Sequence, residues 1–361
     1  MLEQIQSFAG EPRLAVALAA ALIGLVFGAL SESSQYCLLG GLKEARNEGS
    51  NSRLTAYFAG VLAALAFTQI LVGAGVLDLS ASVYLSNTNG LIGLIVGGLI
   101  FGLGAAMTRG CAGRLTVLAA SGNLRAMVVI LVAGVAAYAT MRGILAPPRL
   151  PIEAIARPEA PAADLATTAG LAAIGRYVIA AVALIAALAL AVFAGAWRGF
   201  AAVAIGATIA AGWSASVLLG DDGFDKLQPW SGAFIAPLAN GVQYLMTYTG
   251  AKIDFGVAFL AGALGGAFLS SLIGGRFRLQ GFDGPRQMLR YLGGAILMGF
   301  GGVMALGCTT GQGLSGVSTL SPGSFLAIAA IAAGMWIGIA VDSRAAVKAR
   351  SGAVKSGAIR A

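Results

Sequence analysis

Residues 291–341 contain no charged side chain, 51 positions in a row. A helix needs about 20 apolar residues to cross a hydrocarbon core roughly 30 Å thick, so this run has room for two spans. Its middle, GCTTGQGLSGVSTLSPGS, is nevertheless rich in Gly, Ser and Thr. Lipid cannot hydrogen-bond irregular backbone, so such a segment must be packed among helices or line a polar cavity. The run therefore predicts two membrane spans joined by a polar segment that stays inside the protein at membrane depth.

The rest of the chain is similarly apolar. Of the 361 residues 58% are hydrophobic and 11% are charged, against roughly 25% charged in soluble domains. We expect an all-α integral membrane protein, with about nine transmembrane helices plus short re-entrant helices in one polytopic domain over residues 1–361. The segment 227–251 is broken by proline and indicates a re-entrant or interfacial piece, whereas the Pro-rich segment 147–164 indicates an exposed loop. The seven further runs of spanning length are 14–30, 54–77, 91–108, 126–141, 177–197, 199–220 and 255–275.

The chain also contains an internal repeat, because residues 97–111 align without a gap with residues 294–308. The copies end the third and the eighth predicted spans, five spans apart, so they point in opposite directions. We therefore predict an inverted repeat of four spans, one linking span and four spans, an architecture common among transporters. Its parts are a first repeat (14–145), an exposed loop and linking span (146–198), a second repeat (199–341) and a basic cytoplasmic tail (342–361). The identical pairs are Gly97 and Gly294, Gly102 and Gly299, Gly104 and Gly301, Met107 and Met304, Gly110 and Gly307, and Cys111 and Cys308.

The charges set an expected orientation. When the C-terminal tail is placed in the cytoplasm, 16 of the 23 Lys and Arg fall on the cytoplasmic side of the predicted spans, as the positive-inside rule requires. This predicts a bacterial inner-membrane protein with its N-terminus outside and its C-terminus cytoplasmic. The net charge of +8 then reflects orientation in a lipid bilayer, and we expect no nucleic-acid partner because no basic stripe or aromatic groove accompanies it.

Several kinds of chemistry are excluded by residue type. The chain has no histidine, and its three cysteines lie far apart in sequence. A Cys/His zinc site, a His-ligated haem and a Cys-His nucleophile pair are therefore ruled out. We expect no metal, no cofactor and no enzymatic activity.

The first candidate site is TRGCAGR, residues 108–114, at the end of a Gly-lined span. Gly110 lets the chain turn sharply and expose backbone N–H groups, and a helix that starts there would present its positive end. Arg109 and Arg114 could attract an anion beside Cys111. A tight turn with an inert buried cysteine and two cytoplasmic arginines explains this motif alone equally well.

The second candidate site is LGCTTGQGLSG, residues 306–316. Hydroxyls, an amide and exposed backbone N–H groups can replace the hydration shell of an anion without a fixed charge, which suits transient binding. A packed contact of small residues is the alternative, but Gln312 at membrane depth requires a polar partner. The candidate residues are Gly307, Cys308, Thr309, Thr310, Gln312 and Ser315.

The third candidate site is SSQYCLLGGLKEAR, residues 33–46, which places Cys37 before a Gly-Gly pair and a charged segment. Lys43, Glu44 and Arg46 could attract or gate anions at a cytoplasmic mouth. A cytoplasmic loop with a buried cysteine accounts for this segment alone about as well.

Taken together, YCLLGGLKEA, RGCAGR and GCTTGQGLSG resemble the three signature regions of the YeeE/YedE sulfur-transport family, over essentially the whole chain. The resemblance implies uptake of thiosulfate along a narrow central path on which cysteine thiols make transient S–H contacts. It places Cys111 and Cys308 at two pseudo-symmetric turns and Cys37 in a family-like position. It also makes a cytoplasmic sulfur-carrier protein a candidate partner. Gln312 departs from the family pattern, where histidine is expected, and this departure bears on substrate identity.

Other functions remain open on the sequence. A carrier of selenium compounds or other oxyanions would use the same residue types. A membrane sulfurtransferase with a cysteine nucleophile is a second alternative, although neither turn has a histidine or a nearby acidic residue to act as base. A purely structural membrane protein is a third, but it gives no reason for two mirrored polar turns in an apolar core.

Overall fold

The computed structural model describes residues 12–86, 90–156, 163–171, 173–220, 227–248, 253–282 and 284–355. These residues form helices and loops, with an isolated β-bridge between Asn123 and Gln280. The elements are α2 (Pro12–Ser34), α3 (Leu38–Asn47), α4 (Ser52–Gly73), α5 (Val83–Ser86), α6 (Leu91–Thr108), α7 (Ala112–Ala120), α8 (Leu124–Arg142), α9 (Ala146–Ala154), α10 (Leu165–Thr168), α11 (Ala173–Ala194), α12 (Ala196–Leu218), α13 (Ile235–Met246), α14 (Phe255–Ile273), α15 (Pro285–Met304), the π-helical segment η2 (Gly311–Gly316) and α16 (Pro322–Lys355).

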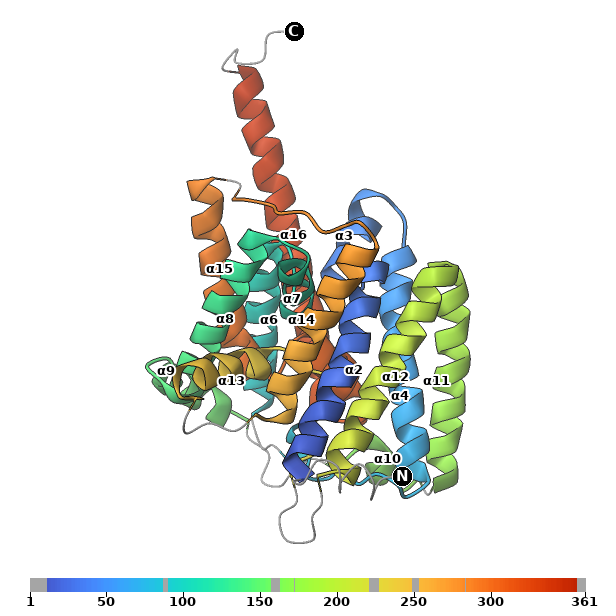
Figure 1. Ribbon diagram of the computed structural model, residues 1–361. Helices are drawn as coiled ribbons and strands as arrows, with labels where there is room; N and C mark the ends of the chain where they lie inside the picture. Colours follow the sequence, from blue (N-terminus) through green and yellow to red (C-terminus); the bar gives the residue numbers. More distant parts are fainter. Residues whose placement is uncertain are drawn as a thin grey trace.

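The long helices run side by side, with the start of α2 at one end of the bundle and the end of α16 at the other (Figure 1). Eight helical stretches of the described chain are long and apolar enough to cross a bilayer. The protein is therefore an all-α, multi-pass membrane protein, as predicted. The remaining predicted span is α15, which has 20 residues but begins with the polar sequence PRQMLRY. Arg290 in this polar part forms an ion pair with Asp342 of α16.

Helices α6 and α15, which carry the two copies of the repeat, approach each other closely. A Cβ atom on Gly104 would lie 2.6 Å from the carbonyl oxygen of Gly294, and one on Gly301 would lie 2.6 Å from that of Gly97. The sequence alignment pairs Gly97 with Gly294 and Gly104 with Gly301, so each contact joins one copy to the other reciprocally. Reciprocal contacts are expected about a two-fold axis. The inverted repeat stays a prediction, with this contact as its local support.

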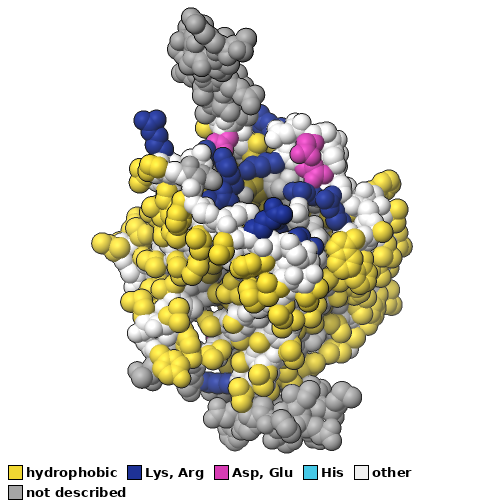
Figure 2. All heavy atoms as spheres, turned by 45° about the horizontal axis from the view of Figure 1, so that its top comes forward, with side chains coloured by type: hydrophobic (Ala, Val, Ile, Leu, Met, Phe, Trp, Pro, Cys, Tyr) yellow, Lys and Arg dark blue, Asp and Glu magenta, His cyan; other side chains and the backbone are white. Residues whose placement is uncertain are grey.

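Charge is concentrated at one end of the bundle. Figure 2 shows Lys and Arg side chains gathered around a hollow there, with two acidic patches beside it and a broad hydrophobic surface below. Helix α11 packs against α4 and α12 at the edge of the bundle (Figure 1). Its outer residues, among them Ile185, Val192 and Phe193, are exposed. Such a surface suits lipid.

Two segments differ from the sequence expectation in detail. The predicted exposed loop 147–164 contains the helix α9, because Pro147 and Pro148 occupy its first turn, where no backbone N–H is needed. Residues 157–162 of that loop lie outside the described residues. The predicted re-entrant segment 227–251 contains the 12-residue helix α13. The side chains of the predicted basic tail beyond residue 342 also lie outside the described residues.

Candidate functional site

Three helices are interrupted in the same way. Backbone φ angles in the left-handed region occur at Gln35 (56°), Arg109 (61°) and Leu306 (56°), close to the ends of α2, α6 and α15. A cysteine follows two residues later in each case, and helix resumes directly after it. Non-glycine residues are uncommon in this region, and each costs roughly 1–3 kcal/mol. Three such residues, each two positions before a cysteine, indicate that these turns are maintained for a functional site.

Each cysteine lies at the N-terminal end of a short helix. Cys37 caps α3 and accepts a hydrogen bond from the Gly40 N–H at 3.4 Å, and Cys111 caps α7. Cys308 precedes the half-helix of residues 309–318 and accepts a hydrogen bond from the Gly311 N–H at 3.4 Å. Helix N-termini carry unpaired N–H groups and the positive end of the helix dipole. All three thiols therefore lie where an anion is favoured.

The three cysteine breaks also meet inside the bundle. Cys37, Cys111 and Thr309, the residue after Cys308, line the same small cavity. All three cysteines are free thiols, and their exposed fractions fall from 8% for Cys37 through 4% for Cys111 to 0% for Cys308. Burial of the thiols thus increases from the border of the charged hollow into the core.

A cavity of about 410 Å³ lies at the charged end of the bundle and reaches Cys37. Arg53 at its wall pairs with Glu44 at 2.9 Å. Within the described residues Lys43, Arg109 and Arg114 have no ion-pair partner, so their charges are available to an anion. Together with these residues, the cavity is lined by Gln35, Leu39, Gly40, Asn47, Glu48 and Leu118.

A second, smaller cavity lies behind Cys37. Its volume is about 10 Å³, room for about one water molecule. Cys37 and Arg114 line both cavities, so they stand between them. The small cavity has no room for an ion larger than water. The remaining lining residues are Phe27, Ser31, Tyr36, Leu38, Tyr57, Cys111, Gly113, Val117, Thr309 and Thr310.

The other predicted residues support the breaks. Gly110 and Gly307 each directly precede a cysteine within a break. The Gln312 amide donates to the Ala305 carbonyl at 2.5 Å, which supplies the polar partner that this residue required. Ser315 donates from Oγ to the Gly232 carbonyl at 2.6 Å. Gln312 and Ser315 therefore hold the half-helix in place and do not line either cavity at the thiols.

Sequence reasoning missed the aromatic part of the site. Tyr57 donates from its hydroxyl to the Thr309 carbonyl at 2.8 Å, and Tyr36 donates to the Tyr57 carbonyl at 2.9 Å. Phe234 lies at the start of a fourth short helix, α13, and its ring packs against the first turn of α7 at Gly113. Aromatic residues in apolar runs carry no signal of such roles. The prolines in 227–251 were the sequence signal that the chain is interrupted near Phe234.

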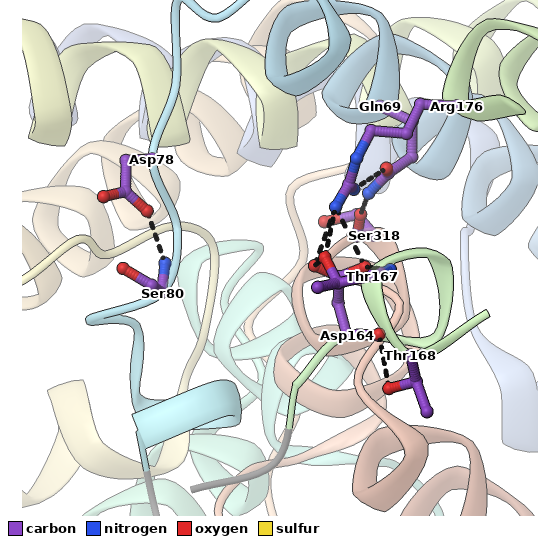
Figure 3. A network of polar contacts seen from close by, with 8 residues as sticks. All are labelled: Gln69, Asp78, Ser80, Asp164, Thr167, Thr168, Arg176 and Ser318. Atoms are coloured by element: carbon purple, nitrogen blue, oxygen red, sulfur yellow. Dashed lines mark hydrogen bonds and ion pairs between the residues drawn. The ribbon is translucent and has the colours of Figure 1, made fainter. Parts of the chain in front are cut away.

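A polar network anchors the far end of the Cys308 half-helix (Figure 3). Arg176 of α11 donates to Asp164 at 2.8 Å and to the Gln69 side chain at 2.8 Å. Gln69 in turn donates to the Ser318 carbonyl at 2.8 Å. Burial alone would raise the pKa of Asp164, but hydrogen bonds from Arg176 and Thr167 outweigh it and hold that pKa below its ordinary value. The network therefore connects the end of the half-helix to α4 and α11.

Known proteins are similar to this chain over most of its length. The chain is 22% identical over 346 residues to the thiosulfate transporter TsuA of Escherichia coli (strain K12), a match that covers 88% of this chain and 92% of that protein. The sequence model of the family described as "Sulphur transport" matches residues 33–337, which include all three cysteine breaks. The chain therefore belongs to the sulphur-transport family.

Proposed function

We propose that the protein carries thiosulfate inward across the bacterial inner membrane, along a path on which Cys308, Cys111 and Cys37 contact the ion in turn. The observation that carries this proposal is the meeting of three free thiols at three half-helix N-termini, next to a cavity with unpaired cations. The charged cavity is then the cytoplasmic end of the path, and the N-terminus is outside. The thiosulfate transport named for the E. coli relative supports the choice of ion.

Weak binding by thiols suits transport. A cysteine S–H is a weak hydrogen-bond donor, so it accompanies the ion without trapping it as a buried arginine would. Neutral thiols are required, because thiolates would repel a dianion. Helix N-termini and the free cations of the charged cavity supply the attraction. Inward movement of a dianion costs about 4–5 kcal/mol per 100 mV of membrane potential, so uptake needs a coupled driving force or a steep gradient.

The test is uptake of radiolabelled thiosulfate into proteoliposomes, with sulfate, sulfite and selenite as competitors. We expect Cys111→Ala and Cys308→Ala each to abolish uptake. The matched control is Thr116→Val on α7, a buried hydroxyl that donates only to the Ala112 carbonyl, at 2.9 Å; its uptake should be near that of the wild type.

The outcomes separate the candidate functions. Undiminished uptake in both cysteine variants would reject the thiol path. Stronger competition by selenite than by unlabelled thiosulfate would favour a selenium-oxyanion carrier. A persulfide recovered on Cys111 or Cys308 after turnover would favour a sulfurtransferase, because it requires cleavage of the S–S bond of thiosulfate and release of sulfite.

A further inference from the structure

A third cavity lies at the end of the bundle opposite the charged hollow. It has a volume of about 400 Å³ and is lined by the beginning of α2, the end of α12 and the beginning of α14. Arg13, Trp230 and Asp254 give it polar walls, and Phe255 lines it too. It is large enough for a hydrated anion, but it does not reach a cysteine.

Four phenylalanine rings separate this cavity from the thiols, and we call them the phenylalanine septum. Phe255, at the cavity, stacks on Phe259 with ring centroids 6.3 Å apart. Phe259 contacts Phe234 at 5.7 Å and Phe27 at 5.4 Å, and Phe27 lines the small cavity beside Cys37 and Cys111. All four rings are buried, with Phe234 fully inaccessible.

Phe234 is the member of the septum that packs against the turn after Cys111. A Cβ atom on Gly113, two residues after Cys111, would lie 3.0 Å from the Phe234 ring and 3.2 Å from the Thr310 hydroxyl. Thr310 lies two residues after Cys308. The Phe234 ring therefore packs against the first turn of α7, close to the Thr310 hydroxyl of the Cys308 half-helix.

We propose that Phe234 is the gate between the third cavity and the thiols, and that its ring must leave the septum before a divalent sulfur oxyanion can reach Cys308. This gate rests on the proposed thiol path. Apolar constrictions block ions because an ion cannot shed its water against them without a large desolvation cost. The same ring then keeps the path closed to other hydrated anions between transport events.

The test measures access to each cysteine in protein reconstituted in lipid nanodiscs, where both faces are open to solvent. The probe is 2-sulfonatoethyl methanethiosulfonate, a charged reagent that forms a disulfide with a thiol and releases methanesulfinate. Mass spectrometry gives the modification rate of each cysteine. In the wild type Cys37 should react and Cys308 should be protected.

In Phe234→Ala we expect Cys308 to react at least about tenfold faster, equivalent to about 1.4 kcal/mol, with Cys37 and Cys111 unchanged. Reagent arriving from the charged cavity would meet Cys111 first, so a rise confined to Cys308 identifies entry through the septum. The matched control is Phe268→Ala on α14, a 41% exposed ring that pairs with Phe277 outside the septum. If Phe234→Ala does not accumulate, Phe234→Leu should give a smaller rise in the same direction.

An unchanged Cys308 rate in folded Phe234→Ala or Phe234→Leu would overturn the gate, as would a joint rise at Cys111 and Cys308. An equal rise in Phe268→Ala would overturn it as well. Because the readout does not involve transport, the two proposals fail separately. A wild type that takes up no thiosulfate but shows the expected labelling would reject the thiosulfate function and keep the gate.

Discussion

The breaks at Cys111 and Cys308 have similar backbones and different side chains. At aligned positions, Arg109 and Leu306 both adopt left-handed φ angles, and each cysteine begins a short helix two residues later. These half-helices reach Ser121 and Ser318, again aligned, and each serine carbonyl accepts a hydrogen bond from another segment. Both breaks can therefore present N–H groups to an anion in the same manner.

The side chains around these two breaks differ in charge. Arg109 and Arg114 line the charged cavity, whereas the aligned positions of the second break are Leu306 and Gly311. On the proposed path the backbone thus provides two similar binding positions, and of these two only the first has cations beside it. This difference suggests that the second break is specialised for passage and the first for exchange with the charged cavity.

We expect the largest effect from substitutions at the glycine contacts between α6 and α15, the two helices that lead into these breaks. Gly104→Val and Gly301→Val each place a side chain against backbone atoms, because a Cβ would lie 2.6 Å from the Gly294 carbonyl in the first and 2.4 Å from the Phe101 nitrogen in the second. Overpacking costs about 1–3 kcal/mol or more, and backbone cannot move aside easily. We expect neither variant to accumulate as monodisperse protein in size-exclusion chromatography.

The control for the glycine pair is Gly265→Val on α14, where an added Cβ meets no atom within 4 Å. It should accumulate normally. Tolerance of valine at one of the paired positions but not at the other would show that the contact between the copies is not reciprocal.

A second prediction would remove the side-chain difference. The double variant Arg109→Leu, Arg114→Gly gives the first break the residues of the second. In inside-out membrane vesicles the charged cavity faces the medium and the ion enters through it. Charge focusing raises encounter rates by about 10-fold to 1,000-fold, so we expect initial uptake into these vesicles to fall by about tenfold at low salt. Wild-type uptake into the same vesicles should also fall as salt increases, while that of the double variant should change little.

Arg142→Gln is the matched control for charge alone, because Arg142 is exposed at the end of α8 and lines no cavity at the thiols. Its uptake and salt dependence should resemble those of the wild type. Equal loss in this control would mean that overall charge, and not the cavity, sets the rate.

The helix breaks could be predicted from the sequence, but the residues packed around them could not. Gly110 and Gly307 before a cysteine, in a run without charge, were sufficient to predict interrupted helices and a buried polar turn. Hydropathy also predicted α15 as a span, although its first turns are polar and include Arg290, which pairs with Asp342. Phe234 was not predictable, because its role depends on rings brought from α2 and α14 by tertiary packing.

The smallest expected effect concerns how the two half-helices end. Ser121 is held by the backbone of Arg278, but Ser318 is held through Gln69 and Arg176 by Asp164. Asp164→Asn weakens this anchor, and partly exposed ion pairs contribute about 1 kcal/mol or less. We expect the melting temperature in detergent at pH 7 to fall by about 1–3 °C, with uptake nearly unchanged.

The difference in melting temperature between wild type and Asp164→Asn should depend on pH, and the pKa of Asp164 sets the direction of that dependence. Because the pKa of Asp164 is lower in the folded protein than its ordinary value, the carboxylate stabilises the fold at neutral pH. That contribution is lost as the pH falls below about 4, where the unfolded chain binds the proton first. The difference in melting temperature between wild type and Asp164→Asn should therefore shrink as the pH is lowered from 7 towards 3.5. A difference that stays constant over this range would mean that the asparagine acts through packing, and that Ser318 does not depend on the charge of Asp164.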